Sequence, residues 1–284
     1  MTSFRGVWVA VVPVLLLTAA CAGQDGAGVA PDAAPTSLPA NVPVLRIDQT
    51  GGFVRPETNV TRLPSVSVYA DGRVITQGPT VLSYPGPALP NVQVRTVSTA
   101  EVAKLVEQAR AAGVGSAVDV GTPKITDVTT TRFTIRGTVG SEQLEVYALG
   151  EATGPEAGLT PAQQAAREKL RTFADKLTDP GNAATQPYQP IAIAAVAGPW
   201  VATPETAKQP RMEWPGPVLP GASLGEGLDL GCVTVTGAAV QQLIATAGKA
   251  NAATPWTSGG KPWTVTLRPL LPDETDCASL TADR

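Results

Sequence analysis

The chain has 284 residues with a formal net charge of −3, and 43% of its residues are hydrophobic while 16% are charged. This length accommodates two domains of ordinary size with buried cores. Histidine is absent, which excludes a triad with a histidine base and any histidine-ligated metal. We therefore expect neither a metal nor a cofactor, and the mild charge gives no reason to expect a nucleic-acid partner.

The N-terminus has the pattern of an export signal. A positive side chain at Arg5 precedes an apolar run, Val7–Leu17, and small residues lie directly before Cys21. This run is shorter than the about 20 residues that span a bilayer. We predict that residues 1–20 are a signal peptide, absent from the mature protein.

The five residues Leu17-Thr18-Ala19-Ala20-Cys21 resemble the signal of bacterial lipoproteins, with Thr18 in place of the usual Leu. The resemblance implies that Cys21 carries the lipid, palmitate included. It also implies anchoring on the extracytoplasmic face of the cell membrane. The alternative is an ordinary secreted protein with a free Cys21. Residues 21–41 contain the lipidated cysteine and a Gly-, Ala- and Pro-rich stretch, which we interpret as a disordered tether.

Residues 42–183 predict a first α+β unit. Two β-rich runs, 65–69 and 74–76, flank Asp71-Gly72, and this dipeptide predicts a hairpin turn with positive φ at both positions. Ser98 is a suitable helix N-cap, and Glu101 completes a capping-box pattern. The apolar face expected for this helix consists of Val102, Leu105, Val106 and Ala109.

A second hairpin and a second helix complete this unit. Alternating apolar residues between 133 and 146 flank a turn at 137–141. Thr160 and Pro161 predict the start of a helix that ends before Pro180-Gly181. Its expected stripe is Ala166, Leu170, Phe173 and Leu177. We interpret residues 182–189 as an interdomain linker.

Residues 190–284 predict a second α+β unit. A short apolar strand is expected over 191–196, Thr236 is the expected N-cap of a helix, and Ser258–Lys261 predicts a hairpin turn. The helix face, listed in chain order, is Val240, Leu243, Ile244 and Ala247, with the same spacing as in the first unit.

A heptapeptide with the pattern aromatic-Pro-Gly-Pro-x-Leu-Pro occurs twice, as Tyr84–Pro90 and Trp214–Pro220. A helix signal follows each copy, and duplication is the leading explanation. The second copy differs by an extra loop over 221–231. The predicted fold class is α+β, with two related units that each consist of an antiparallel sheet and a packed helix.

Once Cys21 is assigned to the lipid, Cys232 and Cys277 remain. In an exported protein two leftover cysteines most simply pair. We predict a disulfide that joins the strand before the second helix to the C-terminal tail. A metal-binding pair is disfavoured because the two cysteines lack a close spacing.

Two motifs suggest chemistry but have a plainer explanation. Ser258 and Lys261 match Ser-x-x-Lys, a nucleophile motif that requires the lysine one helical turn after the serine. The intervening glycines predict a turn instead. Asp273, Glu274 and Asp276 could ligate calcium, but their spacing fits no EF-hand loop. We expect a solvated acidic tail.

Four tryptophans of the mature chain lie in the second unit. If exposed, Trp214, Trp256 and Trp263 would form a ligand surface that stacks on sugars or anchors a protein. The alternative is that they fill the core of a small domain.

Three segments, Leu17–Cys21, Tyr84–Pro90 and Arg268–Glu274, are similar to those of lipid-anchored envelope proteins of high-GC Gram-positive, actinobacterial-type bacteria. The resemblance implies an address at the envelope and no particular activity. We predict a non-catalytic envelope lipoprotein that binds a protein or cell-wall glycan through its second unit. Two alternatives stay open: an envelope hydrolase using carboxylates or the Ser-Lys pair, and a purely structural role.

Overall fold

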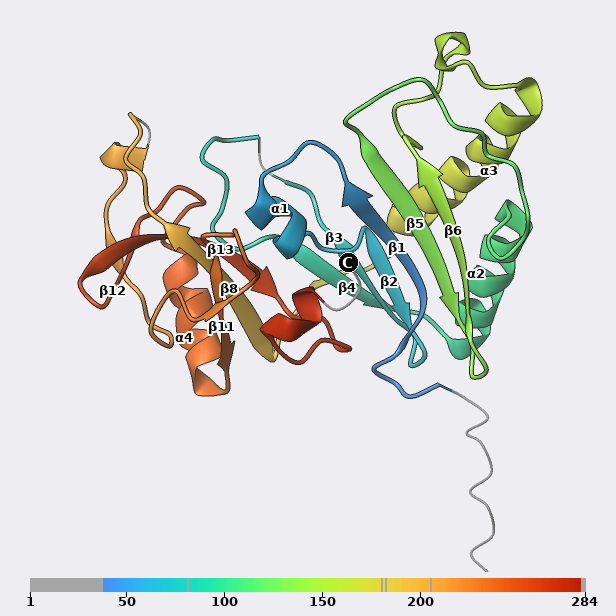
Figure 1. Cartoon of the computed structure of the whole chain (residues 1–284). Coiled ribbons are helices and arrows are strands. Elements are labelled where there is room, and N and C mark those ends of the chain that lie inside the picture. The colour runs from blue at the N-terminus through green and yellow to red at the C-terminus, as the bar shows by residue number, and fades with distance from the viewer. Residues whose placement is uncertain (1–37, 81, 180, 182, 205, 282–284) are drawn as a thin grey trace, which may run out of the picture. The chain divides into compact units, whose positions relative to one another are not determined.

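A computed structural model of the chain describes residues 38–80, 82–179, 181, 183–204 and 206–281 (Figure 1). The predicted signal peptide, Cys21 and most of the tether lie outside the described residues. The fold is α+β, as predicted, with two sheets that are mainly antiparallel and four α-helices. Both sheets belong to one compact unit that covers residues 36–284.

The first sheet has seven strands, and all neighbouring strands are antiparallel. In spatial order they are β6 (Ser141–Tyr147), β5 (Thr129–Arg136), β1 (Pro43–Gly51), β2 (Val66–Tyr69), β3 (Arg73–Gln77), β4 (Val92–Thr96) and β7 (Gln186–Pro187). Helices α2 (Thr99–Ala112) and α3 (Pro161–Thr178) cover one face of the β6–β5–β1 end (Figure 1). The short helix α1 (Pro56–Thr61) follows β1.

The second sheet has six strands, of which only β9 and β12 run parallel to each other. In spatial order they are β10 (Ala222–Ser223), β11 (Gly231–Thr236), β8 (Ala192–Pro199), β13 (Lys261–Pro269), β12 (Trp256–Ser258) and β9 (Met212–Glu213). Helix α4 (Ala238–Ala247) packs on one face. Three 3-10 segments complete the fold: η1 (Pro155–Ala157), η2 (Thr206–Lys208) and η3 (Cys277–Leu280).

Helix α2 confirms the predicted helix and both of its ends. The Ser98 hydroxyl accepts a hydrogen bond from the Glu101 amide at 3.1 Å, which satisfies one of the donors left open at a helix start. Gly113 ends the helix in the left-handed conformation, φ 119°, as the C-cap signal predicts.

Helix α3 begins with a complete capping box, in which Thr160 and Gln163 bond each other's backbone amides. Its buried face contains the predicted Leu170, Phe173 and Leu177. It also contains Arg167, which the apolar stripe did not indicate. The Arg167 guanidinium is fully buried and donates to backbone carbonyls of Val120, Tyr147 and Ala148. This arginine therefore satisfies the carbonyls where β6 ends.

Three local predictions need correction. Only Gly72 of the Asp71-Gly72 pair has positive φ, because its amide closes a turn onto the Tyr69 carbonyl and the loop is one residue longer than predicted. Thr236 is the last residue of β11, and α4 begins after Gly237 without a side-chain cap. Residues Gln186–Pro187 of the expected linker pair with β4 as β7.

The two sheets share a sheet-plus-helix plan but differ in strand order. In the first sheet the hairpin β5–β6 joins the central strand β1 through its first strand. In the second, the hairpin β12–β13 joins β8 through its second strand. The first heptapeptide, Tyr84–Pro90, contacts the second unit and not only its own. Pro87 pairs with Asn251, and Leu89 packs against the core of the second sheet.

Candidate functional site

The first sheet carries charged side chains on the face that α2 and α3 leave open. Alternation along β1 and β5 directs Leu45, Ile47, Phe133 and Ile135 into the helix-covered core. The residues between them face the other way. The strand register places Arg46 opposite Thr134 and Asp48 opposite Arg132.

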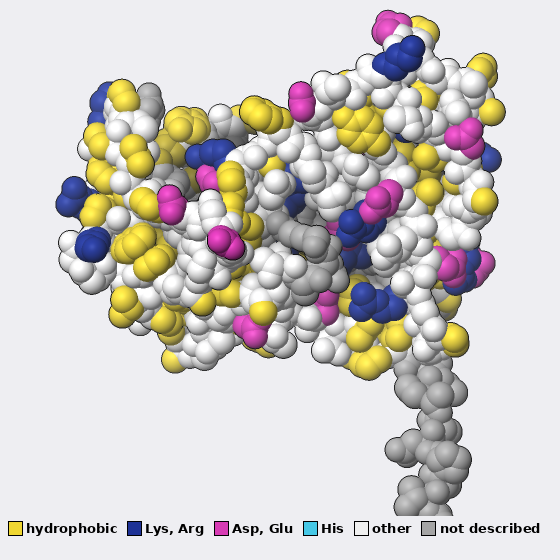
Figure 2. Space-filling model, in the orientation of Figure 1, with side chains coloured by type: hydrophobic (Ala, Val, Ile, Leu, Met, Phe, Trp, Pro, Cys, Tyr) yellow, Lys and Arg dark blue, Asp and Glu magenta, His cyan; other side chains and the backbone are white. Residues whose placement is uncertain are grey.

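A cavity of about 640 Å³ lies over this polar face. Its walls come from β1, β5 and β6, from α1 and the residues after it, and from the C-terminal segment. Among the described residues, five arginines line it, namely Arg46, Arg62, Arg132, Arg136 and Arg268. Two described carboxylates, Asp48 and Glu274, also line it, so this part of the lining carries a net charge of +3 in a chain of net charge −3. Figure 2 shows arginine or lysine side chains with a carboxylate beside them on this side of the first sheet.

The C-terminal segment Arg268–Glu274 closes one side of the cavity. Arg268 and Glu274 form a two-pronged ion pair in which Nη2 lies 2.7 Å from Oε1, and their side chains are 4% and 10% exposed. The Glu274 carboxylate also accepts from the Leu271 amide at 2.7 Å. The segment is thereby folded into a tight loop.

This loop also holds the second sheet against the first. Leu270 packs into a cluster with β8, and Leu271 packs with Leu63, Tyr69, Ile75 and Val92 of the first unit. The Asp273 carboxylate accepts from Arg46 Nη2 at 2.7 Å and from the Tyr69 hydroxyl at 2.6 Å. A further bond runs from the Tyr188 hydroxyl to the Leu270 carbonyl.

The arginine and tyrosine side chains at this contact stay protonated across the physiological pH range. Burial, the largest single cause, would lower the pKa of Arg46, but Asp273, Tyr69 and Asp48 together outweigh burial and raise it. Burial, with help from the Asp273 carboxylate, raises the pKa of the Tyr69 hydroxyl well above its usual range. Burial likewise raises the pKa of Tyr188, to about 12. Arg46 therefore stays positive and Tyr69 neutral across the physiological range.

Two cavity arginines have donors to spare. Among the described residues, neither Arg62 nor Arg136 forms an ion pair. Arg62 uses Nη1 to contact the Gln49 and Gly51 carbonyls, each at 3.1 Å. The buried Nε of Arg268 has no hydrogen-bond partner. These N–H groups can donate hydrogen bonds to a negatively charged ligand.

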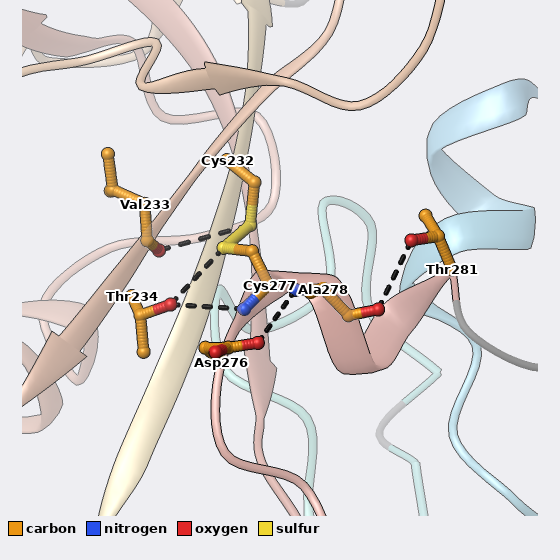
Figure 3. The surroundings of a disulfide bond; sticks show 7 residues. All are labelled: Cys232, Val233, Thr234, Asp276, Cys277, Ala278 and Thr281. Atoms are coloured by element: carbon orange, nitrogen blue, oxygen red, sulfur yellow. Dashed lines mark hydrogen bonds between the residues drawn. A yellow bond between two sulfur atoms is a disulfide. The ribbon is translucent and has the colours of Figure 1, made fainter.

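The predicted disulfide is present and fixes a wall of the cavity (Figure 3). Cys232 on β11 is bonded to Cys277 at the start of η3, with their Cα atoms 6.0 Å apart. Thr234 accepts from the Cys277 amide at 3.1 Å, and Asp276 caps η3 through the Ala278 amide. Because η3 carries Ser279 and Leu280 to the cavity, the disulfide positions them.

The tryptophans lie away from the cavity. Trp256 is fully buried and Trp214 is 8% exposed, and their rings meet edge to face with centroids 5.6 Å apart. Trp263 is half-buried and donates to the Ser258 carbonyl at 3.2 Å. The burial of Trp214 and Trp256 favours the alternative in which these residues fill the core of the second sheet.

The two chemical motifs also have structural roles. Ser258 and Lys261 flank a turn in which Gly259 and Gly260 have positive φ, as predicted, and the serine hydroxyl accepts from the Leu219 amide. The expectation of a solvated acidic tail is wrong for Asp273 and Glu274, because both are ion-paired with arginines in part-buried positions.

The described part of the chain contains no group of three or more metal-ligating side chains placed to hold an ion. Within the same residues, no helix is long and apolar enough to cross a membrane. No protein-family model matches the chain, and neither a curated protein nor a solved structure shows detectable similarity to it.

The arginine cavity was not anticipated from the sequence. Its signal is present in Arg46-Ile47-Asp48 and Arg132-Phe133-Thr134, where charged or polar residues alternate with core residues. Such alternation is also typical of an ordinary solvent-facing sheet surface. What distinguishes the two cases is the C-terminal segment, which returns from far along the chain to enclose this face.

Proposed function

We propose that the protein is an exported, lipid-anchored binding protein that takes a negatively charged ligand in its arginine-lined cavity. The observation that carries this proposal is the excess of five arginines over two carboxylates around one cavity, in a chain of net negative charge. A cavity whose lining has an excess of one charge sign attracts a ligand of the opposite sign.

The arginines divide into two groups. Arg46, Arg132 and Arg268 are paired with Asp273, Glu145 and Glu274, and these pairs hold the walls in place. Arg62 and Arg136 are the residues that we expect to meet the ligand. The planar guanidinium suits carboxylate and phosphate groups, because it can donate two parallel hydrogen bonds to them.

An envelope location supports the same function. The export signal and the cysteine at the end of it favour attachment through Cys21 on the extracytoplasmic face of the membrane. The disulfide between Cys232 and Cys277 fits a compartment that is oxidising. An anchored binding protein would meet anionic groups of envelope glycans or envelope proteins there.

The hydrolase alternative has less support. Of the two carboxylates that line the cavity, Glu274 is engaged by Arg268, and Asp48 lies opposite Arg132 in the strand register. The Ser258 hydroxyl is engaged by a backbone amide. The cavity therefore offers donors for an anion more readily than an activated nucleophile or a general acid.

The test is calorimetric titration of the full chain, purified in detergent, with galacturonate and glycerol phosphate against their neutral counterparts galactose and glycerol. We expect binding of the anions alone, weakening as salt rises. The double variant Arg62→Gln/Arg136→Gln should lose it. The matched double variant Lys104→Gln/Lys169→Gln, on the exposed sides of α2 and α3, should keep it. Equal binding of neutral and charged probes would contradict the proposal.

Lipid attachment is tested separately by mass spectrometry of the N-terminal peptide from membrane-extracted protein. We expect the peptide to begin at Cys21 and to carry acyl chains. The variant Cys21→Ser should leave the membrane fraction. An unmodified Cys21 at the mature N-terminus would refute the anchor and leave the binding proposal intact.

A further inference from the structure

Arg62 and Arg136, which form no ion pair among the described residues, lie beside opposite ends of β1. Arg136 follows Ile135, which pairs with Leu45 near the beginning of β1. Arg62 bonds the carbonyls of Gln49 and Gly51, at the end of β1. A strand rises about 3.4 Å per residue, so the two contact points are roughly 20 Å apart. The cavity follows β1 over the whole distance, because its lining runs from Pro43 to Gly51.

The middle of the cavity is polar but less uniformly positive. Arg46 and Arg132 there are already paired with carboxylates, and Asp48 adds a negative charge. The remaining lining offers amides and hydroxyls, among them Gln49, Thr134, Gln143 and Ser279. Such groups bind neutral hydroxyls as donors and acceptors. The pattern is therefore a cation at each end with hydroxyl-binding groups between.

This pattern disfavours a peptide as the occupant. A peptide gains affinity most readily by adding a strand to a free sheet edge. The floor of the cavity is β1, which is already paired with β2 on one side and β5 on the other. A ligand that lies along β1 therefore meets no free strand edge there, and the apolar lining among the described residues is limited to Pro43, Leu63, Pro64 and Leu280.

Building on the proposed function, we propose that the ligand is an extended, hydroxyl-rich polymer segment, such as an envelope glycan, that carries anionic groups spaced to reach Arg62 and Arg136 together. Carboxylate and phosphate groups share the required chemistry. A ligand that engages both ends gains from linkage, because the second contact forms at a high effective concentration once the first is made.

The experiment titrates the full chain in detergent with oligogalacturonates from monomer to hexamer, and with glycerol-phosphate oligomers of matched length. We expect affinity to rise at least about tenfold with length, and then to level off once both arginines are reached. Tighter binding of either series supports the proposal and tells carboxylate from phosphate. Oligoglutamate of equal length should bind more weakly than both.

Variants separate the two ends. Arg62→Gln and Arg136→Gln should each weaken hexamer binding by about fivefold, while a monomer can still use the remaining arginine. The combined variant should bind hexamer no better than monomer. Lys104→Gln/Lys169→Gln is the control, and unchanged thermal unfolding shows that each variant is folded.

The outcomes distinguish this inference from the proposed function. If no anion binds at any length, the proposed function fails and this inference fails with it. If monomers bind as tightly as hexamers, the anion site stands and the extended ligand is refuted. If oligoglutamate matches the best glycan oligomer, the hydroxyl-rich ligand is refuted.

Discussion

The two sheets differ most clearly on the faces that their helices do not cover. In the second sheet, β8 is buried on both faces. Ile193, Ala195 and Ala197 lie in the α4 core, while Ala194 and Val196 pack with Leu270, Leu280 and the α1 residue Val60. In the first sheet, the corresponding face of β1 carries Arg46 and Asp48. The second sheet is therefore a two-sided core, whereas the first sheet has a second apolar cluster only over β2–β4 and exposes charged residues to the cavity along β1 and β5.

This difference between the uncovered faces of the two sheets explains where the cavity lies. The α1 helix and the C-terminal segment cover the second sheet with their apolar residues, and the same elements present Arg62, Glu274 and Ser279 to the first sheet. The tryptophans Trp214 and Trp256, which attract attention in the sequence, belong to the two-sided core. The arginines, which resemble a solvated surface, belong to the enclosed site. The buried tryptophans therefore stabilise the fold, whereas the charged residues that line the cavity form the candidate functional site.

The largest effect is expected from Trp256→Ala, which tests whether the tryptophans stabilise the second core. Trp256 is fully buried and belongs to the second core. Truncation of a buried tryptophan typically costs about 3–5 kcal/mol, and we expect that loss in urea-induced unfolding. The exposed aromatic residue Phe53 is the control, and Phe53→Ala should stay within about 0.5 kcal/mol of wild type. A stable Trp256→Ala protein that loses its ligand would instead place the ligand surface at the tryptophans.

The disulfide joins the two regions, because Cys232 is in the two-sided core and Cys277 begins the segment that walls the cavity. The bonded residues are 45 positions apart in the sequence. The chain-entropy model gives about 4 kcal/mol for a loop of this length. We expect Cys232→Ala/Cys277→Ala to lower the free energy of unfolding by about that amount, measured without reductant.

The same double variant should also weaken binding of anionic oligomers, because Ser279 and Leu280 lose their fixed position. Addition of reductant to the wild type should reproduce both effects and should not alter the variant further. Unchanged stability with weakened binding would show that the disulfide serves the cavity alone.

Local signals in the sequence were sufficient for most elements. Ser98 with Gly113, Thr160 with Pro161, and Gly259-Gly260 define helix ends and a turn through neighbouring residues, and the structure confirms them. The disulfide followed from the count of cysteines in a chain that we predict to be exported. These predictions need only interactions that are close in sequence, or a choice with few alternatives.

The cavity depends on information of another kind. Arg46 meets Asp273 across 227 positions, and neither residue type nor spacing indicates that contact. Arg167 is buried because three carbonyls converge on it, which an apolar stripe does not reveal. Strand order decided the rest, because a hairpin signal does not state which of its strands joins the central one. Long-range pairing of charged residues is therefore where sequence reasoning stopped.

A smaller effect is expected from Glu274→Gln, which tests whether the Arg268–Glu274 loop holds the polar region together. The change leaves the Arg268 guanidinium buried without a charged partner, and removal of one member of a buried pair costs about 3 kcal/mol or more. Glu107→Gln, which removes an exposed pair with Arg110, should cost less than about 1 kcal/mol. Equal effects of the two changes in chemical denaturation would mean that the loop does not support the cavity.

The smallest effect is expected from alkaline pH, which acts on the contact between the sheets and leaves the tryptophan core alone. The pKa of Tyr188 is raised by burial to about 12, whereas an unfolded tyrosine titrates near 10. The folded state therefore keeps a proton that the unfolded state releases, and stability is complete below pH 10 and lost as pH rises toward 12. Between pH 10 and 11 the loss amounts to at most about 1 kcal/mol for this group, because solvent screening of the partly exposed side chain reduces it.

The measurement is urea unfolding at pH 8, 10 and 11, followed by tryptophan fluorescence. Tyr188→Phe lowers stability at pH 8, since the bond to the Leu270 carbonyl is lost, and should reduce the alkaline loss by the share of Tyr188, while Tyr69, whose pKa burial also raises, keeps the rest. Tyr84→Phe, at an exposed tyrosine, is the matched control and should follow the wild type. A Tyr188→Phe protein with the full alkaline loss would show that Tyr188 does not contribute to it, and that the loss arises from other groups, Tyr69 included.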